Sequence, residues 1–281
     1  MATRMQRLQL AQETIRILRE GWYLNEEVQQ VSIEASLAAA VAGSRFFSPD
    51  DLARLMTQPP PASPPTAGLQ VRVVPETAIQ GIRYLLDRQA PAVLALNFAS
   101  AKHPGGGFLS GAEAQEESLA RSSGLYPCLT RFMQEMYHFH RQQRSPFYSD
   151  RMIYAPQVPL FRDHRHLLLN QPYLVSFISA PAVNAGVLRR QAPEQLMALA
   201  PAMRQRVGYV LGLAQCLGYR YLVLGAWGCG VFANEPADVA DHFRYHLIDN
   251  PRFAGAFDRV RFSIYDQTPE QRVLGAFQAA F

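Results

Sequence analysis

The sequence predicts an α/β protein in which a mixed, mostly parallel sheet lies between helices. Apolar runs typical of strands alternate with helical patterns from residue 69 to the end of the chain, as expected of parallel strands joined by helices. Residues 92–98 (AVLALNF) form a nearly continuous apolar run, which is typical of a strand covered on both faces. With 281 residues, of which 48% are hydrophobic, the chain is long enough to bury a large core.

The chain begins with a helical pattern whose apolar residues recur up to Gly21, where we expect the helix to end. Residues 22–58 give weaker signals, among them an Ala-rich stretch and a short helix after Ser48. The proline-dense segment 59–65 predicts a surface loop or linker. Because the residues before it are too few for a core of their own, we expect residues 1–68 to form an N-terminal extension packed on a main domain of residues 69–281.

The main domain is expected to contain six strands and four helical regions. The strands are expected at 69–74, 92–98, 152–154, 174–179, 221–224 and 260–265, and the helical regions at 77–88, 112–142, 193–217 and 235–248. Pro201 should kink the third helical region or separate its first turns from the rest.

Composition limits the class of protein. The net charge is +4, yet no run of five basic residues occurs, so a dedicated nucleic-acid surface is not indicated. Of the 27 basic residues only Lys102 is a lysine, which we attribute to arginine-rich codon usage. No stretch is long and apolar enough to span a membrane, and the N-terminus lacks the pattern of a signal peptide. Three widely spaced cysteines form no disulfide framework, so we expect a cytoplasmic protein.

Two loops follow predicted strands, at the edge of the sheet where ligands bind in this class of fold. The first carries Gly105, Gly106 and Gly107 after the strand that contains Asn97. Consecutive glycines before a helix allow a close backbone approach to an anion, although a tight connection without a ligand has the same pattern. Ser110 and Glu113 read as a capping box that would begin the next helix.

That helix carries the sequence Gln115-Glu116-Glu117, which the capping box would place about two turns into it. A solvated helical face is the ordinary interpretation of such a sequence. Near bound phosphates, however, two adjacent carboxylates would repel further negative charge, and this would raise a carboxyl pKa into the range useful for a general acid.

The second loop has three glycines within residues 225–230 and continues to Phe232. It could be a tight connection or a nucleophile elbow that presents Cys229. The surrounding sequence, W-G-C-G-V, lacks one glycine that such an elbow requires. His242 and His246 could share one helical face, but no third metal ligand accompanies them, so we expect no metal and no cofactor.

Taken together, the two loops resemble those of the bacterial-type poly(ADP-ribose) glycohydrolases, whose catalytic body is a macrodomain. The family hallmark is a triple glycine followed seven residues later by Gln-Glu-Glu, as at 105–107 and 115–117 here. The segments NFASA, SLARSSGLY, Tyr148-Ser149-Asp150 and GAWGCGVFAN also match, and the likeness covers nearly the whole chain. The resemblance implies a macrodomain-like fold with an N-terminal helical extension.

The resemblance also implies roles for single residues. Glu117 would be the catalytic acid, and Glu116 would hydrogen-bond the ribose hydroxyls. The implied substrate-binding residues are Asn97, Gly105, Gly106, Gly107, Gln115, Gly228, Cys229, Gly230, Val231 and Phe232. Within this set the glycine loop would contact the distal ribose, the second loop would hold the diphosphate, and Phe232 would pack on the terminal ribose.

The implied reaction is hydrolysis of the ribose–ribose O-glycosidic bond of poly(ADP-ribose), with release of ADP-ribose. Neighbouring helix residues point about 100° apart, so Glu116 and Glu117 cannot flank a sugar as the carboxylates of ordinary glycosidases do. In the family that the chain resembles, the N-terminal extension is associated with covering the adenosine side, so the resemblance also implies action at chain ends. We expect a monomeric enzyme of the DNA damage response that also interacts with ADP-ribosylated proteins. A macrodomain that only binds ADP-ribose and a mono-ADP-ribosyl hydrolase stay open as alternatives.

Overall fold

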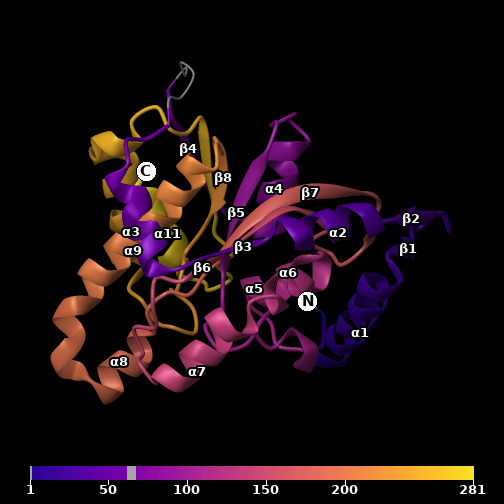
Figure 1. The fold of residues 1–281 in the computed structure, drawn as a ribbon, viewed down its shortest axis with the longest axis horizontal. Helices are drawn as coiled ribbons and strands as arrows, with labels where there is room; N and C mark the ends of the chain where they lie inside the picture. Colours follow the sequence, from indigo (N-terminus) through magenta and orange to yellow (C-terminus); the bar gives the residue numbers. More distant parts are fainter. Residues whose placement is uncertain (1, 62–67) are drawn as a thin grey trace.

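The computed structural model describes residues 2–61 and 68–281, and in these residues a seven-stranded sheet lies between two layers of helices (Figure 1). The strand order is β3-β6-β7-β5-β8-β9-β4. Four of the pairings are parallel, whereas β3–β6 and β6–β7 are antiparallel, which confirms a mixed, mostly parallel sheet. The strands are β3 (Arg45–Phe47), β4 (Gln70–Val74), β5 (Val93–Phe98), β6 (Met152–Arg162), β7 (Leu168–Ala180), β8 (Tyr221–Leu224) and β9 (Arg259–Ser263).

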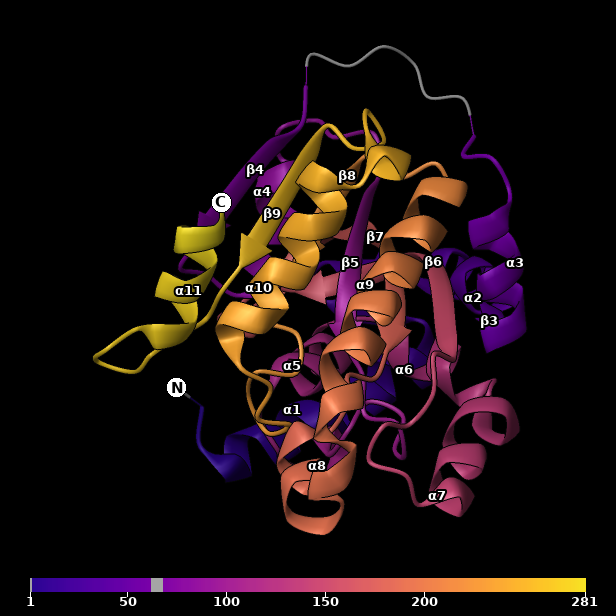
Figure 2. The same cartoon turned by 90° about the vertical axis from the view of Figure 1, so that its left-hand side faces the viewer.

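Helices cover both faces of the sheet, and alternate residues of β5 show the two faces. Leu94 and Leu96 belong to the core cluster shared with α3, α9, α10 and α11, while Val93 and Ala95 belong to the cluster shared with α2, α4, α5 and α6. In Figure 2, α9 and α10 lie across the near face of the sheet. The helices are α1 (Arg4–Glu20), α2 (Glu34–Gly43), α3 (Pro49–Thr57), α4 (Ala78–Leu86), α5 (Gln115–Ser122), α6 (Leu125–Thr130), α7 (Phe139–Gln143), α8 (Ala185–Gln191), α9 (Leu199–Cys216), α10 (Pro236–Arg244) and α11 (Arg272–Ala280).

Short elements join these parts. A two-stranded ribbon pairs β1 (Trp22–Leu24) with β2 (Gln30–Ser32). The remaining turns are the 3-10 helices η1 (Phe108–Ser110), η3 (Pro193–Ala198) and η5 (Pro251–Phe253) and the π-helical turns η2 (Met133–His138) and η4 (Tyr245–Asp249). Within the described ranges, no helix is long and apolar enough to cross a membrane.

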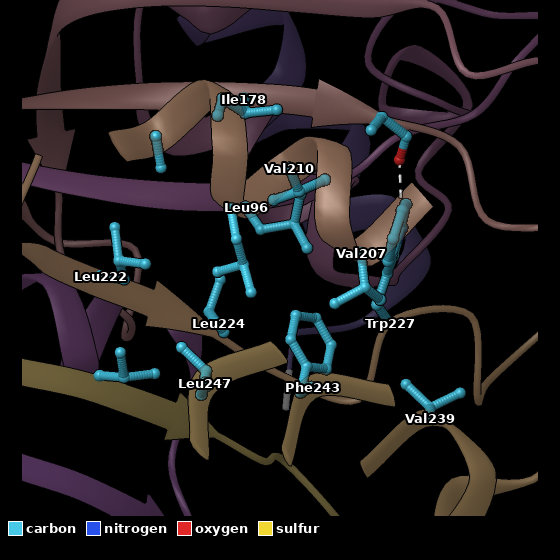
Figure 3. Packing of buried hydrophobic residues seen from close by; sticks show 14 of the residues in the cluster. Leu96, Ile178, Val207, Val210, Leu222, Leu224, Trp227, Val239, Phe243 and Leu247 are labelled. Carbon is cyan, nitrogen blue, oxygen red and sulfur yellow. Dashed lines mark hydrogen bonds between the residues drawn. The ribbon is translucent and has the colours of Figure 1, made fainter. Parts of the chain in front are cut away.

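The larger core cluster fixes the sheet beneath the second loop (Figure 3). Leu96, Leu222 and Leu224 of the sheet face Val207 of α9 and Phe243 of α10. Trp227, which follows β8, is fully buried in the same cluster, and its indole N–H donates to the Ala180 carbonyl of β7 at 3.1 Å. The start of the second loop is thereby anchored in the core.

Several expected elements differ in extent from the patterns that predicted them. The strands expected at 152–154 and 174–179 are parts of one long hairpin, β6–β7, whose register shifts beside Gln157. Gln157 has a φ of +43° and lies between two prolines, so the alternation that marks a strand is broken there. The first turns of this region form the separate 3-10 helix η3, and Pro201 is the third residue of α9, so the helical region is divided just before the proline, as expected.

The segment before residue 69 contributes to the same core as the rest of the chain. β3 is the edge strand of the main sheet, and Leu52 of α3 is fully buried in the larger cluster. α1 ends at Gly21 in the left-handed conformation, as the sequence predicts. The proline-dense segment expected at 59–65 lies outside the described residues from position 62 to its end.

A buried network ties α1 to α5. The Thr14 hydroxyl is fully buried and donates to the Arg121 carbonyl at 2.7 Å. The guanidinium of Arg162, also fully buried, donates to the Thr14 hydroxyl at 2.6 Å, to the same Arg121 carbonyl, and to the carboxylate of Glu13. The N-terminal extension is thus joined by hydrogen bonds to the end of the helix that carries Glu116 and Glu117.

Replacing Thr14 tests this network. Thr14→Val keeps the shape of the side chain and removes the hydroxyl, so we expect the free energy of unfolding to fall by about 1–3 kcal/mol in urea denaturation, because buried partners lose a hydrogen bond. Thr14→Ser keeps the hydroxyl and should lose less than half of that amount. A larger loss in Thr14→Ser than in Thr14→Val would mean that methyl packing, and not the network, holds α1 in place.

Candidate active site

The loop after β5 needs glycine where it approaches α5. Gly105 and Gly106 have φ values of +69° and +59°, a conformation that residues with a Cβ rarely adopt. A Cβ on Gly106 would also lie 2.2 Å from Glu117 Oε1. The glycine loop can therefore bring its backbone against the glutamate pair only because side chains are absent.

The expected capping box is wrong. Ser110 lies at the end of η1, where its hydroxyl donates to the Gly107 carbonyl at 2.9 Å, and Glu113 pairs with Arg7 of α1. The loop makes an extra 3-10 turn before the helix, so α5 begins at Gln115 with Ala114 as its N-cap and no side-chain cap. Glu116 and Glu117 consequently lie in the first turn of α5, and not two turns into it.

Gln115 joins this first turn to the sheet. Its side-chain amide donates to the Leu96 carbonyl at 2.7 Å and accepts from the Phe98 amide at 2.9 Å. Both polar ends are thus engaged by the last residues of β5. The geometry fixes the start of α5 relative to the end of the strand, while a direct contact of Gln115 with substrate stays a prediction.

Glu116 is a buried carboxyl held by two groups at the end of β5. It is only 3% exposed and accepts from the Ser100 amide at 2.6 Å and from Asn97 Nδ2 at 3.3 Å. Asn97 is itself fully buried and donates to the Ser179 hydroxyl at 2.9 Å. Burial raises the pKa of Glu116 to about 8, and the nearby Glu117 carboxylate contributes in the same direction.

Glu117 is held by the glycine loop. Its Oε1 accepts from the Gly107 amide at 2.9 Å, and the side chain is half-buried. Oε2 accepts no hydrogen bond from any residue in the described ranges, so one carboxylate oxygen is fixed and the other is available to a ligand. The structure therefore brings the glycine loop and both glutamates together, as the sequence predicts.

The second loop is fixed in shape by Asn234. This buried side chain donates to the Val183 carbonyl at 2.8 Å and to the Gly228 carbonyl at 3.1 Å. Gly228 has a φ of +79°, and a Cβ there would lie 2.6 Å from both Ala182 and Asn234. The loop can follow this path only with glycine at position 228.

The same loop offers free backbone donors. The amides of Gly230, Val231 and Phe232 donate to no group of the described chain, whereas those of Cys229, Ala233 and Asn234 bond within the loop. Adjacent free amides form an anion-binding surface. Val231 is 88% exposed, and the half-buried Phe232 packs on Tyr148 with ring centroids 5.8 Å apart.

The surroundings of Cys229 do not support a nucleophilic thiol, and those of His242 and His246 do not support a metal site. Burial raises the pKa of Cys229 to about 12, which is the opposite of what a nucleophilic thiol needs. His246 bonds the Arg204 carbonyl, and Arg204 donates to His242. In the part of the chain that the structure describes, no group of three or more His, Cys, Asp or Glu side chains could hold a metal ion.

A cavity of about 1520 Å³ lies along the carboxyl edge of the sheet. The second loop from Gly228 to Phe232 lines it, together with Gln115 and the side chains of Gln6, Gln9 and Glu13 on α1. Asn97, the glycine loop and the two glutamates are not among its lining residues. They border the site at the start of α5, beside Ala114 and Gln115, which do line the cavity.

This fold and this site define a macrodomain-like hydrolase, because a mixed sheet carries at one edge a glycine loop, a loop of free amides and a pair of glutamates on a helix. The family model of the microbial-type PARG catalytic domain matches residues 11–163, more than half of the chain. The chain belongs to the microbial-type poly(ADP-ribose) glycohydrolase (PARG) family.

Solved structures of bacterial PARG proteins are similar over most of the chain. The PARG structure from Thermomonospora curvata has 43% sequence identity and a TM-score of 0.93, covering 98% of this chain and 99% of that one. The same protein bound to the inhibitor ADP-HPD has a TM-score of 0.89 at 43% identity, with the same coverage. PARG from Deinococcus radiodurans in complex with ADP-ribose has 45% identity and a TM-score of 0.81, covering 87% of this chain and 96% of that one. A comparison with curated protein sequences finds no match.

Sequence reasoning missed several residues that hold the site. Ser100 and Ser179 bond Glu116 and Asn97, but single serines near strand ends carry no signal of their own. Tyr148 belongs to a segment that matches the family, but its packing on Phe232 and its φ of +54° become visible only in the structure. The fully buried Arg121 donates to the Ala112 carbonyl behind the glycine loop.

The raised pKa of Glu116 predicts how stability depends on pH. In the unfolded chain this carboxyl ionises near pH 4.5, whereas in the folded chain it keeps its proton up to about pH 8. Unfolding therefore releases a proton within that window, and the free energy of unfolding should fall as the pH rises through it, by on the order of 4 kcal/mol in total.

The measurement is the difference in unfolding free energy between wild type and Glu116→Gln, taken by urea denaturation from pH 4 to pH 9. The variant lacks the titrating group, so the difference should favour it increasingly as the pH rises and then level off. A difference independent of pH would show that folding does not raise the pKa of Glu116.

Proposed function

We propose that the protein is a poly(ADP-ribose) glycohydrolase that cleaves the ribose–ribose O-glycosidic bond from chain ends and releases ADP-ribose. The observation that carries the proposal is the hydrogen bond from the Gly107 amide to Glu117 Oε1. It holds a carboxyl with one free oxygen against the loop that would receive the scissile ribose. The similarity to PARG structures with ADP-HPD and with ADP-ribose supports the same substrate class.

In this proposal the second loop binds the diphosphate. Its free amides at Gly230, Val231 and Phe232 would donate to phosphate oxygens, and the backbone of Gly228 and Cys229 would complete the turn around them. The ring of Phe232 would pack on the terminal ribose. The cavity beside the loop is large enough for the adenosine, and α1 closes one of its sides.

The distal ribose would lie between the glycine loop, Glu116 and Asn97. Because burial raises the pKa of Glu116 to about 8, this carboxyl is protonated at neutral pH and can donate to a ribose hydroxyl. Asn97 Oδ1 is buried without a hydrogen-bond partner in the described chain, and a substrate hydroxyl would satisfy it. Gly105, Gly106 and Gly107 leave room for the sugar to approach the backbone.

Glu117 would serve first as acid and then as base. Its proton passes to the departing 2′-oxygen while the C1″–O bond breaks, and the anomeric carbon develops oxocarbenium character. A water placed by the diphosphate then attacks C1″, and its proton returns to the Glu117 carboxylate. The two glutamates are helix neighbours and cannot lie on opposite faces of the sugar, so Glu116 cannot act as a second catalytic carboxyl from the other side. We therefore assign both steps to Glu117.

Two alternatives differ from this proposal in specific features. A module that only binds ADP-ribose would not need a glutamate whose carboxylate is oriented by the glycine loop, as Glu117 is. A mono-ADP-ribosyl hydrolase would accept a target protein in place of the next ribose. The α1 side chains that line the cavity support action at chain ends. If an internal unit were bound there, the polymer would need an open path out of the cavity on the side where these side chains lie.

The proposed setting is that of a monomeric cytoplasmic enzyme of the DNA damage response. Its partners would be poly(ADP-ribose), ADP-ribose and ADP-ribosylated proteins. It would use no metal or cofactor, associate with no membrane and read no nucleic-acid sequence. Incubation with labelled poly(ADP-ribose), followed by chromatography of the products, would separate end cleavage, internal cleavage and inactivity in one experiment.

Glu117→Gln tests the catalytic assignment. Glutamine can still accept the Gly107 amide, but it has no acidic proton, so we expect turnover on poly(ADP-ribose) to fall by roughly 10²–10⁴-fold with little change in ADP-ribose affinity. ADP-ribose release and calorimetry measure the two quantities. Glu26→Gln, which removes an exposed glutamate between β1 and β2, is the matched control and should stay active. Turnover of Glu117→Gln within about threefold of wild type would mean that another group is the acid.

Cys229→Ala and Phe232→Ala together test the role of the second loop. Cys229→Ala keeps the backbone amides and should keep most of the activity, since the thiol is not used. Phe232→Ala removes the ring over the ribose, and a small misplacement of the sugar can lower turnover by on the order of 10²-fold. Both variants are compared on one polymer preparation. An inactive Cys229→Ala beside an active Phe232→Ala would replace this mechanism with a cysteine nucleophile.

A further inference from the structure

The segments that lie around Phe232 carry five basic residues. Lys102 precedes the glycine loop, Arg141 is in α7 and Arg144 directly follows that helix, and both Arg189 and Arg190 are in α8. The four arginines are exposed and Lys102 is half-buried. We refer to these five residues, Lys102, Arg141, Arg144, Arg189 and Arg190, as the basic rim.

The helices that carry the basic rim reach Phe232 from two directions. His140 of α7 packs edge-on against Tyr148 with ring centroids 5.7 Å apart, and Tyr148 packs in turn on Phe232. The amide of Gly186 in α8 donates to the Phe232 carbonyl at 2.9 Å. Both helices lie at the lower edge of the molecule in Figure 1 and in Figure 2. The basic rim is therefore next to the ring that would hold the scissile ribose.

Two members of the basic rim are fixed to the two substrate loops themselves. Arg141 Nη1 donates to the carbonyl of Lys102 at 3.0 Å, and Arg189 Nη1 donates to the carbonyl of Ala233 at 2.7 Å. A carbonyl orients a guanidinium but does not neutralise it. Each loop thus has a positively charged guanidinium bonded to its backbone.

The charge of the basic rim is not cancelled by carboxylates. None of its five members forms an ion pair within the described ranges, whereas other arginines of the same half of the chain do, such as Arg206 with Asp150 and Arg220 with Asp258. Glu135, Asp150 and Glu194 are the acids nearest to α7 and α8 in sequence, and none of them pairs with a member of the basic rim. Five uncompensated cations on one border favour a polyanionic ligand.

The direction in which a polymer would leave the site identifies that ligand. In the proposed function the terminal ADP-ribose fills the cavity, and the next unit is attached to the scissile ribose beside the glycine loop and Phe232. Every further unit carries two phosphates and must leave the site at this border. We propose that the basic rim is a second binding site, which holds the diphosphates of the units on the leaving side of the scissile bond.

This proposal rests on the proposed function, and it makes a separate statement about affinity. A single ADP-ribose fills the cavity without reaching the basic rim, whereas an oligomer occupies both. Affinity should therefore increase with the number of ADP-ribose units, and the increment should weaken with salt as counterion release requires. After cleavage, the shortened polymer stays attached at the rim while ADP-ribose leaves the cavity.

The experiment compares the binding of ADP-ribose with that of a linear oligomer of about five units. All binding is measured on proteins carrying Glu117→Gln, so that the oligomer stays intact. In that background Arg144→Glu combined with Arg190→Glu should weaken oligomer binding by roughly tenfold, and should lower the slope of log affinity against log salt by about 1 to 2. ADP-ribose binding should change by less than about twofold.

Arg72→Glu combined with Arg88→Glu is the matched control. It changes the net charge by the same amount with exposed arginines that form no ion pair in the described chain and lie on the edge strand β4 and beyond the end of α4. We expect it to leave both affinities unchanged. Arg144→Gln combined with Arg190→Gln should show the oligomer effect at about half its size on a logarithmic scale, which gives a second, milder variant if the glutamates impair folding.

Either of two results in the variants would overturn the proposal. One is an oligomer affinity that falls equally in the rim variant and in the control, and the other is a parallel loss of ADP-ribose binding in the rim variant. Failure of the proposed function looks different, because the wild-type protein would then release no ADP-ribose from polymer. An enzyme that releases ADP-ribose normally but gains no affinity from additional units contradicts the basic rim alone.

Discussion

The hydrogen bond from the Gly107 amide to Glu117 Oε1 is the interaction on which the site depends, since it joins the glycine loop to the helix that follows it. It can form only because Gly106 has no side chain, as a Cβ there would collide with the same carboxylate. It also requires α5 to begin at a fixed place relative to β5, and the side-chain amide of Gln115 provides this by bonding the strand at two points. The loop, the strand and the helix thus determine one another's positions.

This arrangement buries Glu116, which is unfavourable for the ionised carboxyl. A carboxyl in the first turn of a helix is favoured by the helix dipole, but Glu116 is almost completely removed from water and lies beside a second carboxylate. The Ser100 amide and Asn97 compensate part of the penalty, and burial shifts the group toward its neutral form. The rest of the fold must therefore hold α5 firmly, which the buried network from Thr14 and Arg162 to the Arg121 carbonyl does from behind.

Much of the fold and of the site could be predicted from the sequence, because the patterns that mark them lie within short stretches of the chain. The buried strand β5 showed as a continuous apolar run, and the glycine loop with Glu116 and Glu117 showed as a motif. The start of α5 was misplaced, because a Ser-x-x-Glu pattern also occurs where a 3-10 turn uses the serine differently. The short strand β3 and the position of Arg162 could not be predicted, since both depend on partners that are distant in the sequence. The start of α5, the strand β3 and the position of Arg162 are determined by tertiary contacts, which a local sequence pattern does not contain.

Positive charge is distributed unequally between the second loop and the basic rim. The second loop, residues 225–234, contains no lysine or arginine and offers neutral amides, whose attraction for an anion acts only at close range. The basic rim carries full charges whose field extends over a Debye length of roughly 8 Å at physiological ionic strength. If cations surrounded the diphosphate itself, they would bind the product ADP-ribose as strongly as the terminal unit of the substrate. In the binding mode proposed above, cations beyond Phe232 would direct the long-range attraction to the part of the polymer that stays behind, so a polymer would be captured without retention of the product.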